Sequence, residues 1–268
     1  MKFTSIRLKG LYTIDLPISN IRATDPYLLK SAEGLGPPEV NIFISKTTNM
    51  DGYYKGRQAQ YREIVLNIGL NPNYQNDITI SDLRTELYGL LSPLASDSFD
   101  IFILNNDVEL MQVQGYIKKF EIMPFTAEPE VQLTISCLKA SFESPNTIFI
   151  ETISDTYQEV LNLGTAEAGL ILEIEFQSEC TNFTISDSRG NTMVINHDFF
   201  ELDILNIDTR PGNRSITLQR DNTIESIIYS LSMQSEWLWL YGGLNVITTP
   251  NTEFAWRTLS YIPQYWGI

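Results

Sequence analysis

The chain has 268 residues, of which 43% are hydrophobic and 19% are charged, and it carries a formal net charge of -15. This length suits two domains, and the hydrophobic fraction is typical of a folded protein rather than a disordered one. The acidic balance argues against binding nucleic acid or an anionic membrane by charge, because both kinds of binding need clustered Lys and Arg.

The opening of the chain predicts a strand over residues 3–16 and a short second strand over residues 27–30. No apolar run has the length of a secretory signal or of a membrane span, so we expect neither. Residues 34–38 read GLGPP, which superficially looks like a phosphate-binding glycine loop. Pro37 and Pro38 lack the N–H groups that would hold a phosphate, and no helix follows, so we interpret the segment as a structural turn.

The polar segment TTNMDGYYKGRQAQYR, residues 47–62, connects two predicted strands at residues 40–44 and 64–68. One interpretation of this segment is a solvated hairpin. The other is a subunit contact, because Tyr and Arg are enriched at protein interfaces. The residues that would make the contact are Tyr53, Tyr54, Arg57, Tyr61 and Arg62.

The sequence SDLRTELYGLLSP predicts a helix over residues 81–92. Ser81 is the expected N-cap, because its hydroxyl can accept a hydrogen bond from the first turn, and Pro93 ends the helix. Four leucines recur at helical spacing and form one apolar stripe: Leu83, Leu87, Leu90 and Leu91. Since strands are predicted on both sides of this helix, we expect the stripe to lie on a sheet.

Three further strands are predicted over residues 101–104, 110–120 and 131–138, with a tight turn at residues 105–107. Sequential strands with short connections usually pair as antiparallel hairpins. We therefore predict a first domain over residues 1–143, an antiparallel β-sandwich or barrel that carries the helix.

The strand pattern lapses over residues 142–147 and then resumes as short strands. Turns are predicted at residues 187–190 (DSRG) and 210–213 (RPGN), and a short helix at residues 224–231. A last predicted strand ends in Trp237, Trp239 and Tyr241 before Gly242-Gly243. Strands separated by about 8–12 residues with such turns are typical of a β-sandwich or jelly roll. We predict such a domain over residues 144–268, so the fold class is all-β with one helix in the first domain.

The residue types that act in catalysis or bind metals do not form a recognisable catalytic or metal-binding motif in this sequence. His197 is the single histidine, and we expect it in a surface turn. Glu173 and Glu175 share one outer strand face, whereas a glycosidase needs two carboxylates across a cleft. Cys137 and Cys180 are expected to be buried thiols of a protein made in a reducing cytoplasm, with a bridge as the less favoured alternative. We predict no catalytic, metal or cofactor site, and no enzyme.

Aromatic residues crowd the end of the chain. Most of them should fill the core, because a sandwich needs large inward-pointing side chains. A minority, Trp256, Tyr265 and Trp266, could instead form a stacking platform for a saccharide.

Several motifs together resemble a known family. In chain order, GLGPPEV, GYYKGR, REIVLNI, DLRTELYGLLSP, GYIKKFE and PEVQLTISC resemble the N-terminal domain of the distal tail proteins (Dit) of siphophages. FTISDSRGN, LDILNIDTRPGNRSITL, SEWLWLYGGLNVI and YIPQYWGI resemble the C-terminal, galectin-like β-sandwich of the same family. The resemblance covers nearly the whole chain. Its weight lies in the order of the motifs, because no single motif is specific.

The resemblance implies a structural role without catalysis. Members of that family form a homohexameric ring through their N-terminal domains, at the tail tip or baseplate of the virion. The implied partners are the tail tube protein, the baseplate hub protein, and tail fibres or receptor-binding proteins, while DNA passes through the ring without being held. Two alternatives stay open: a carbohydrate-binding protein that acts through the second sandwich, and a polysaccharide hydrolase.

Overall fold

The computed structural model describes residues 2–10, 12–18, 25–46, 52–91, 98–123, 129–150 and 156–268. It is built mainly from antiparallel strands with one α-helix in the described ranges, which confirms the predicted fold class. Two compact units divide the chain: Met1–Pro145 together with Trp266–Ile268, and Asn146–Tyr265. The domain boundary predicted from the sequence, between residues 143 and 144, stays a prediction.

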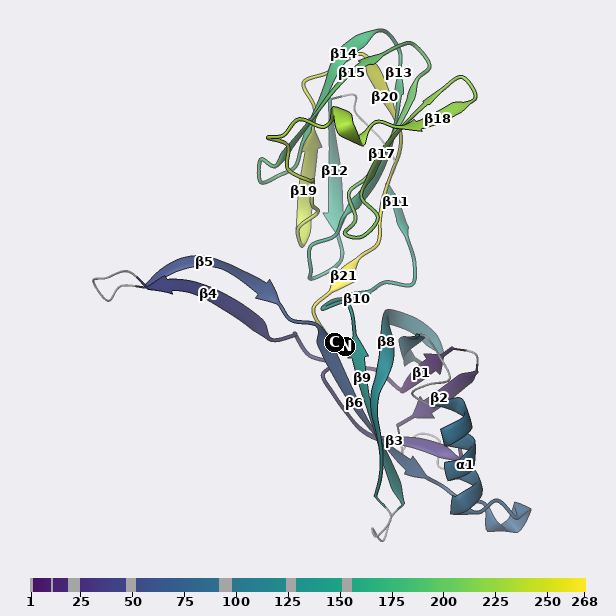
Figure 1. Cartoon of the computed structure of the whole chain (residues 1–268). Helices are drawn as coiled ribbons and strands as arrows, with labels where there is room; N and C mark the ends of the chain where they lie inside the picture. Colours follow the sequence, from purple (N-terminus) through teal and green to yellow (C-terminus); the bar gives the residue numbers. More distant parts are fainter. Residues whose placement is uncertain are drawn as a thin grey trace. The chain divides into compact units, whose positions relative to one another are not determined.

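The first unit is organised around one antiparallel sheet with the strand order β2-β1-β7-β8-β9-β6-β3 (Figure 1). A parallel bridge between Ile18 and Leu29 brings the two ends of this order together, so the sheet nearly closes into a barrel. The strands are β1 (Ser5–Lys9), β2 (Thr13–Pro17), β3 (Tyr27–Glu33), β6 (Arg62–Leu70), β7 (Phe99–Asn105), β8 (Val108–Met123) and β9 (Glu130–Cys137). The short strand β10 (Phe142–Glu143) pairs with β8.

The core of the first unit follows from the alternation along its strands. On β6 and β9, every second residue is fully buried, and the buried residues pair directly across the two strands. These pairs are Ile64 with Ile135, Leu66 with Leu133 and Ile68 with Val131. Each such pair removes two branched side chains from water on the same face of the sheet.

Helix α1 (Ile80–Leu90) lies within the predicted segment, but its N-cap is Thr79 rather than Ser81. Thr79 and Asp82 form a capping box, in which each side chain accepts a hydrogen bond from the backbone N–H of the other residue. The predicted stripe is confirmed at the three leucines that the structure buries: Leu83, Leu87 and Leu91. Leu90 is only half-buried, and Pro93 lies outside the described residues. A 3₁₀ turn, η1 (Tyr74–Asn76), precedes the helix.

A side-chain contact fixes α1 to the sheet. The Tyr27 hydroxyl on β3 donates to the Glu86 carboxylate at 2.7 Å and lies 3.2 Å from the carbonyl oxygen of Leu83. Burial raises the pKa of the Tyr27 hydroxyl, and the hydrogen bond to Glu86 raises it further.

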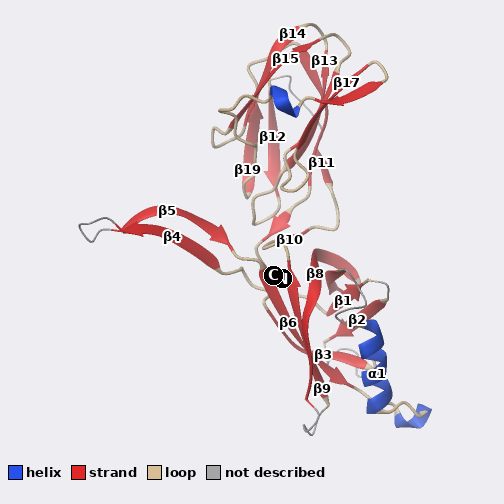
Figure 2. Cartoon of the chain, in the orientation of Figure 1, coloured by secondary structure: helices blue, strands red, loops and turns tan. Residues whose placement is uncertain are grey.

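Strands β4 (Val40–Lys46) and β5 (Gly52–Ala59) form a separate two-stranded sheet within the first unit. Figure 2 shows this pair extending away from the main sheet of its unit. We call it the ribbon.

The second unit is a sandwich of two antiparallel sheets. The first has the order β11-β20-β13-β16-β17-β18 and the second the order β12-β19-β14-β15. The strands of these sheets are β11 (Ile148–Ile150), β12 (Tyr157–Asn162), β13 (Leu170–Phe176), β14 (Cys180–Ser186), β15 (Thr192–Phe199), β16 (Ile204–Asp208), β17 (Ser215–Arg220), β18 (Thr223–Ser226), β19 (Gly243–Thr248) and β20 (Phe254–Tyr261). Strand β21 (Gln264–Tyr265) belongs to neither sheet.

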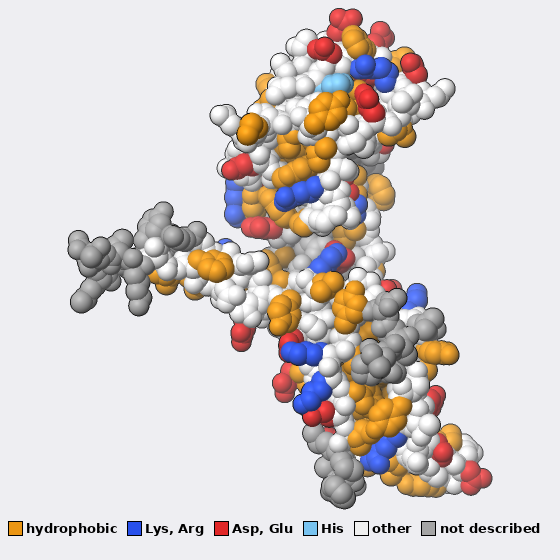
Figure 3. Space-filling view, viewed as in Figure 1, with side chains coloured by type: hydrophobic (Ala, Val, Ile, Leu, Met, Phe, Trp, Pro, Cys, Tyr) orange, Lys and Arg blue, Asp and Glu red, His pale blue; other side chains and the backbone are white. Residues whose placement is uncertain are grey.

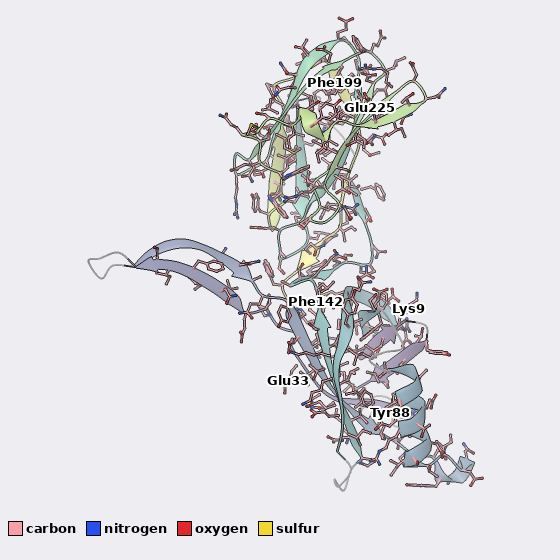
Figure 4. All side chains as sticks on the ribbon, viewed as in Figure 1. Lys9, Glu33, Tyr88, Phe142, Phe199 and Glu225 are labelled. Carbon is pink, nitrogen blue, oxygen red and sulfur yellow. The ribbon has the colours of Figure 1, made fainter. Side chains whose placement is uncertain are left out.

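Side chains from both sheets fill the space between them. Phe176 of β13 stacks on Phe199 of β15 with ring centroids 4.2 Å apart, and Phe183 of β14 meets Phe176 edge-on (Phe199 is labelled in Figure 4). Offset and edge-on ring packing joins the sheets more firmly than burial of the same area alone.

Three predictions for the second half need correction. Residues 224–231 form the end of strand β18 and a 3₁₀ turn, η2 (Ile228–Ser230), instead of a short helix. His197 lies within β15 rather than in a turn. Residues 236–239 lie outside the strands, because their backbone groups bond irregularly to the Asp187 carboxylate and to Thr192. The two predicted turns are confirmed, with Gly190 and Gly212 both at positive φ.

Candidate interaction surfaces

The ribbon exposes apolar side chains that strand residues usually bury. On β4, Val40, Ile42, Phe43 and Ile44 are 48%, 62%, 48% and 60% exposed. Ile42 and Ile44 point to one face of the ribbon and Phe43 to the other, so both faces lie open in one chain. Figure 3 shows hydrophobic surface along this arm. A two-stranded sheet is marginal alone in water, so a covering partner would stabilise it.

The chain leaves the main sheet for the ribbon at a glycine that accepts no other residue. Gly34 has φ +78, and a Cβ at this position would lie 1.8 Å from the carbonyl oxygen of Glu63. Positive φ and close backbone approach are the two conditions that favour glycine. GLGPP is therefore a structural turn, as the sequence predicts.

Arg62, at the start of β6, holds this region together from inside. Its guanidinium donates to four backbone carbonyls: those of Gly34 at 2.5 Å, Gly36 at 2.6 Å, Ala140 at 2.8 Å and Trp266 at 2.7 Å. The same group lies 4.2 Å from the ring centroid of Phe142, which Figure 4 labels. Arg62 is only 2% exposed, and burial lowers the pKa of its guanidinium. The guanidinium thus serves to bind backbone carbonyls of its own unit.

The other predicted interface residues have different positions. Tyr61 is 60% exposed beside the base of the ribbon, and Arg57 is exposed on β5. Tyr53 and Tyr54 belong to β5, but their side chains lie outside the described part of the structure. A role for these residues in a subunit contact stays a prediction.

A surface hollow of about 400 Å³ lies beside the base of the ribbon. Its walls come from the turn at Gly34, Pro37 and Pro38 and from Tyr61 and Glu63. A hollow of this volume has room for several side chains of a partner, so it is a candidate docking site beside the exposed strand β4.

Of the three residues predicted for a saccharide platform, Trp256 lies in the core, and a platform at Tyr265 and Trp266 stays a prediction. Trp256 is 7% exposed and meets Phe254 edge-on in the core of the second unit. Tyr265 belongs to the second unit and Trp266 to the first, and both are half-buried. Trp256 thus serves the core, as most aromatic residues were expected to do.

A different set of aromatic residues lies at the surface of the second unit. Trp237, Trp239 and Tyr241 alternate with Leu238 and Leu240, which are fully buried. We call these three half-buried rings the aromatic row. Trp237 also packs in part against the core of the sandwich.

Two arginines cover the aromatic row. The Arg214 guanidinium lies 5.1 Å from the ring centroid of Trp237 and 5.8 Å from that of Trp239. The Arg189 guanidinium lies 3.6 Å from the ring centroid of Tyr241. These distances are those of cation–π contacts.

The Asp187 carboxylate connects the turn that carries Arg189 with the backbone of the aromatic row. Asp187 is 5% exposed and accepts hydrogen bonds from the backbone N–H groups of Arg189, Asn191 and Trp239. The Asn191 amide also donates to Asp187 and to the Tyr241 hydroxyl. Turn 187–190 and the aromatic row are therefore held in one hydrogen-bonded network.

Two carboxylates of the second unit share one arginine, and both thiols of the chain are buried. Glu173 and Glu175 both lie near Arg257, at 3.3 and 3.5 Å, on a partly exposed strand face. No group of three or more potential metal ligands occurs among the residues that the structure describes.

Cys137 and Cys180 are both buried and free, as the favoured prediction states. No helix in the described ranges has the length and apolarity needed to cross a membrane.

Comparison with known proteins places this fold in context. Residues 163–265 match the family model described as siphovirus-type tail component, C-terminal domain. The solved structure of the SPP1 Dit (gp 19.1) protein, described as a paradigm of hub adsorption apparatus in phages that infect Gram-positive bacteria, is similar over 97% of this chain and 98% of that chain, with 15% identity and a TM-score of 0.66. Two phage P2 baseplate structures, with Ca and Sr, cover 97% of both chains at 8% and 7% identity, with TM-scores of 0.42 and 0.41. No curated protein sequence matches the chain.

Proposed function

We propose that this chain, whose residues 163–265 match the model of the siphovirus-type tail component family, is a member of that family and forms the structural hub of a siphophage tail tip or baseplate. Six copies form a ring that joins the tail tube to the baseplate hub and the adsorption apparatus. Tail fibres or receptor-binding proteins attach to this ring. The protein is made in the cytoplasm of the bacterial host and works in the virion without catalysing a reaction.

The exposed strand β4 is the observation that carries this proposal. A folded chain gains little by leaving Ile42 and Ile44 in water, since burial of each side chain is worth about 1.5–3 kcal/mol. A ribbon that reaches from one subunit to a different surface on the next makes a head-to-tail contact, and such contacts close into rings. The hollow beside Tyr61 is a candidate for part of that second surface.

The acidic balance of the chain agrees with a passage for DNA. A net charge of -15 repels phosphates, so a ring of such chains would let DNA pass without holding it. A channel lined mainly by Lys and Arg would contradict this part of the proposal.

Light scattering after size exclusion tests the ring. Six copies of a 30.6 kDa chain have a mass of roughly 180 kDa, and we expect this mass for the wild type at micromolar concentration. The double variant Ile42→Glu/Ile44→Glu should remain folded and run near the mass of one chain, because each contact would have to bury the two charges of one ribbon.

Ile224→Glu is the matched control, because Ile224 is also exposed on a strand, at 68%, but belongs to β18 of the second unit. We expect this variant to keep the assembled mass. A second variant, Tyr54→Ala/Arg57→Ala, tests the residues predicted from the sequence and should weaken assembly. A wild-type chain that stays a monomer at high concentration would overturn the ring.

A carbohydrate-binding role through the C-terminal sandwich is the alternative function. The aromatic row supports it, because aromatic faces at a protein surface can stack on sugar rings. This role is compatible with the hub, since it would use the second unit and leave the ribbon free for assembly. The hydrolase alternative lacks support, because Glu173 and Glu175 share Arg257 on one strand face instead of facing each other across a cleft.

A further inference from the structure

The second unit is acidic, and most of its few basic groups are neutralised. It holds five arginines and no lysine against sixteen Asp and Glu residues. Three arginines have close carboxylate partners: Arg210 with Asp208, Arg220 with Asp203, and Arg257 with Glu173 and Glu175. Arg214 makes no ion pair with any residue that the structure describes, and the nearest carboxylate to Arg189 is the exposed Glu167, at 3.8 Å.

The two arginines with the least neutralisation are the two that cover the aromatic row. Cation–π contacts with Trp237, Trp239 and Tyr241 restrict the positions of both guanidinium groups. Neither guanidinium donates a hydrogen bond to any residue that the structure describes. Both groups therefore offer donors to a carboxylate or a phosphate.

The backbone under this surface is held in place before any ligand arrives. The buried Asp187 carboxylate fixes the turn that carries Arg189 and the backbone N–H of Trp239. Binding groups that are already ordered lose less conformational entropy when a ligand binds.

We propose that the aromatic row, with Arg189 and Arg214, binds an anionic saccharide, a chain of sugar units that carries carboxylate or phosphate groups. The three rings alternate with buried leucines along one segment of the chain, so the row presents repeated ring surfaces to a linear polymer. Sugar C–H groups contact the part of each half-buried ring that stays exposed beside the arginines, while the acidic groups pair with the two guanidinium groups.

This inference deepens the saccharide-binding alternative and does not depend on the ring. Binding is measured by calorimetry with the full-length wild type and three probes: an oligogalacturonate for the carboxylate, a phosphodiester-linked glycosylated polyol for the phosphate, and uncharged dextran. We expect one or both anionic probes to bind, more weakly as salt rises, and dextran to bind at least about tenfold more weakly.

The double variant Arg189→Gln/Arg214→Gln should reduce the affinity for the anionic probe at least about tenfold, because it removes both guanidinium forks. Arg257→Gln is the matched control. It removes a partly exposed arginine of the same unit that lies elsewhere, and it should bind as the wild type does. The mass of the assembled particle should be the same for all variants, which separates this test from the test of the ring.

Four results would overturn the proposal. They are no binding of either anionic probe, equal binding of dextran, an equal loss of affinity in Arg257→Gln, and equal binding of polyglutamate. The last result would indicate an acidic peptide as the ligand.

Discussion

The guanidinium of Arg62 and the carbonyl oxygen of Trp266 lie 2.7 Å apart although 204 residues separate them in the chain. This hydrogen bond connects the first residue of β6 with the segment that returns from the second unit. The backbone N–H of Ile268 adds a second tie, at 3.1 Å from the carbonyl oxygen of Leu35. The first unit is therefore completed by residues 266–268.

Replacing Arg62 should destabilise the first unit. Arg62→Met leaves four carbonyl groups without their donor, which we expect to cost at least about 3 kcal/mol in free energy of unfolding. Arg62→Lys should have an intermediate effect, because an ammonium group cannot reach four carbonyls in a planar array. Hydrogen exchange by mass spectrometry should show faster exchange around residues 34–36 and 266–268. Lys119→Met, at an exposed site, should leave exchange unchanged, and equal effects of both variants would contradict this role.

Two neighbouring glycines should differ in their tolerance of alanine. Gly34→Ala combines positive φ with a Cβ placed 1.8 Å from the Glu63 carbonyl, so we expect a loss of at least about 3 kcal/mol. Gly36→Ala is the control, because its Cβ would meet no atom within 4 Å, and its effect should stay within about 1 kcal/mol. Urea titration of both variants measures the difference. A tolerated Gly34→Ala would show that this turn has another conformation.

The ion pair of Asp203 and Arg220 should make the second unit sensitive to acid. Asp203 is 2% exposed and accepts two close hydrogen bonds from Arg220, and a third from the backbone N–H of Phe200. Burial alone would raise the pKa of Asp203, but these bonds outweigh it and lower the pKa. The stabilisation is therefore present above the ordinary carboxyl pKa of about 3.9 and is lost as the pH falls below it toward the lower folded value.

Arg220→Gln should cost about 2 kcal/mol at pH 6, less than for a fully buried pair because the Arg220 side chain is 37% exposed. Asp203→Asn should flatten the loss of stability as the pH falls below about 4, where the wild type begins to lose this stabilisation. Thermal unfolding at several pH values measures both effects. An Asp203→Asn variant with the acid sensitivity of the wild type would assign that sensitivity to other carboxylates.

Both thiols should resist modification in the folded chain. Burial raises the pKa of the Cys137 thiol to about 11, and burial also raises the pKa of Cys180. At pH 8 only about one thousandth of the Cys137 thiol would be the reactive thiolate, even before access is considered. An aromatic disulfide reagent should therefore react slowly with the native protein and with two thiols after denaturation. Rapid reaction of one equivalent would show that a thiol becomes accessible in the native state.

The sequence pattern predicted the positions of strands better than it predicted which strand faces are buried. Val40, Ile42 and Ile44 on β4 have the same alternation as Ile64, Leu66 and Ile68 on β6. The first set is exposed and the second is fully buried. Burial depends on which strands pair across the sheet. Among the described strands, β6 pairs with β3 and β9, whereas β4 pairs only with β5. Periodicity along one strand contains no information about these partners.

The N-cap of α1 and the role of Arg62 show two further limits. Thr79 and Ser81 can both cap a helix, and the decision lies in Asp82, which stands three residues after Thr79 and completes the capping box. Arginine is a residue type that is enriched at interfaces. The carbonyl groups that bind Arg62, however, come from residues 34, 36, 140 and 266, which only the fold brings together. The stacking of Arg189 and Arg214 on the aromatic row depends on the fold for the same reason.

The dependence of the first unit on residues 266–268 has a consequence for biosynthesis. These residues leave the ribosome only after the whole second unit, so the first unit waits for its last segment for on the order of ten seconds at common translation rates. A nascent or prematurely terminated chain lacks the groups that Arg62 and Leu35 bind. The turn from which its ribbon starts then lacks these hydrogen bonds. Incorporation into a particle would then be restricted to chains translated through this final stretch.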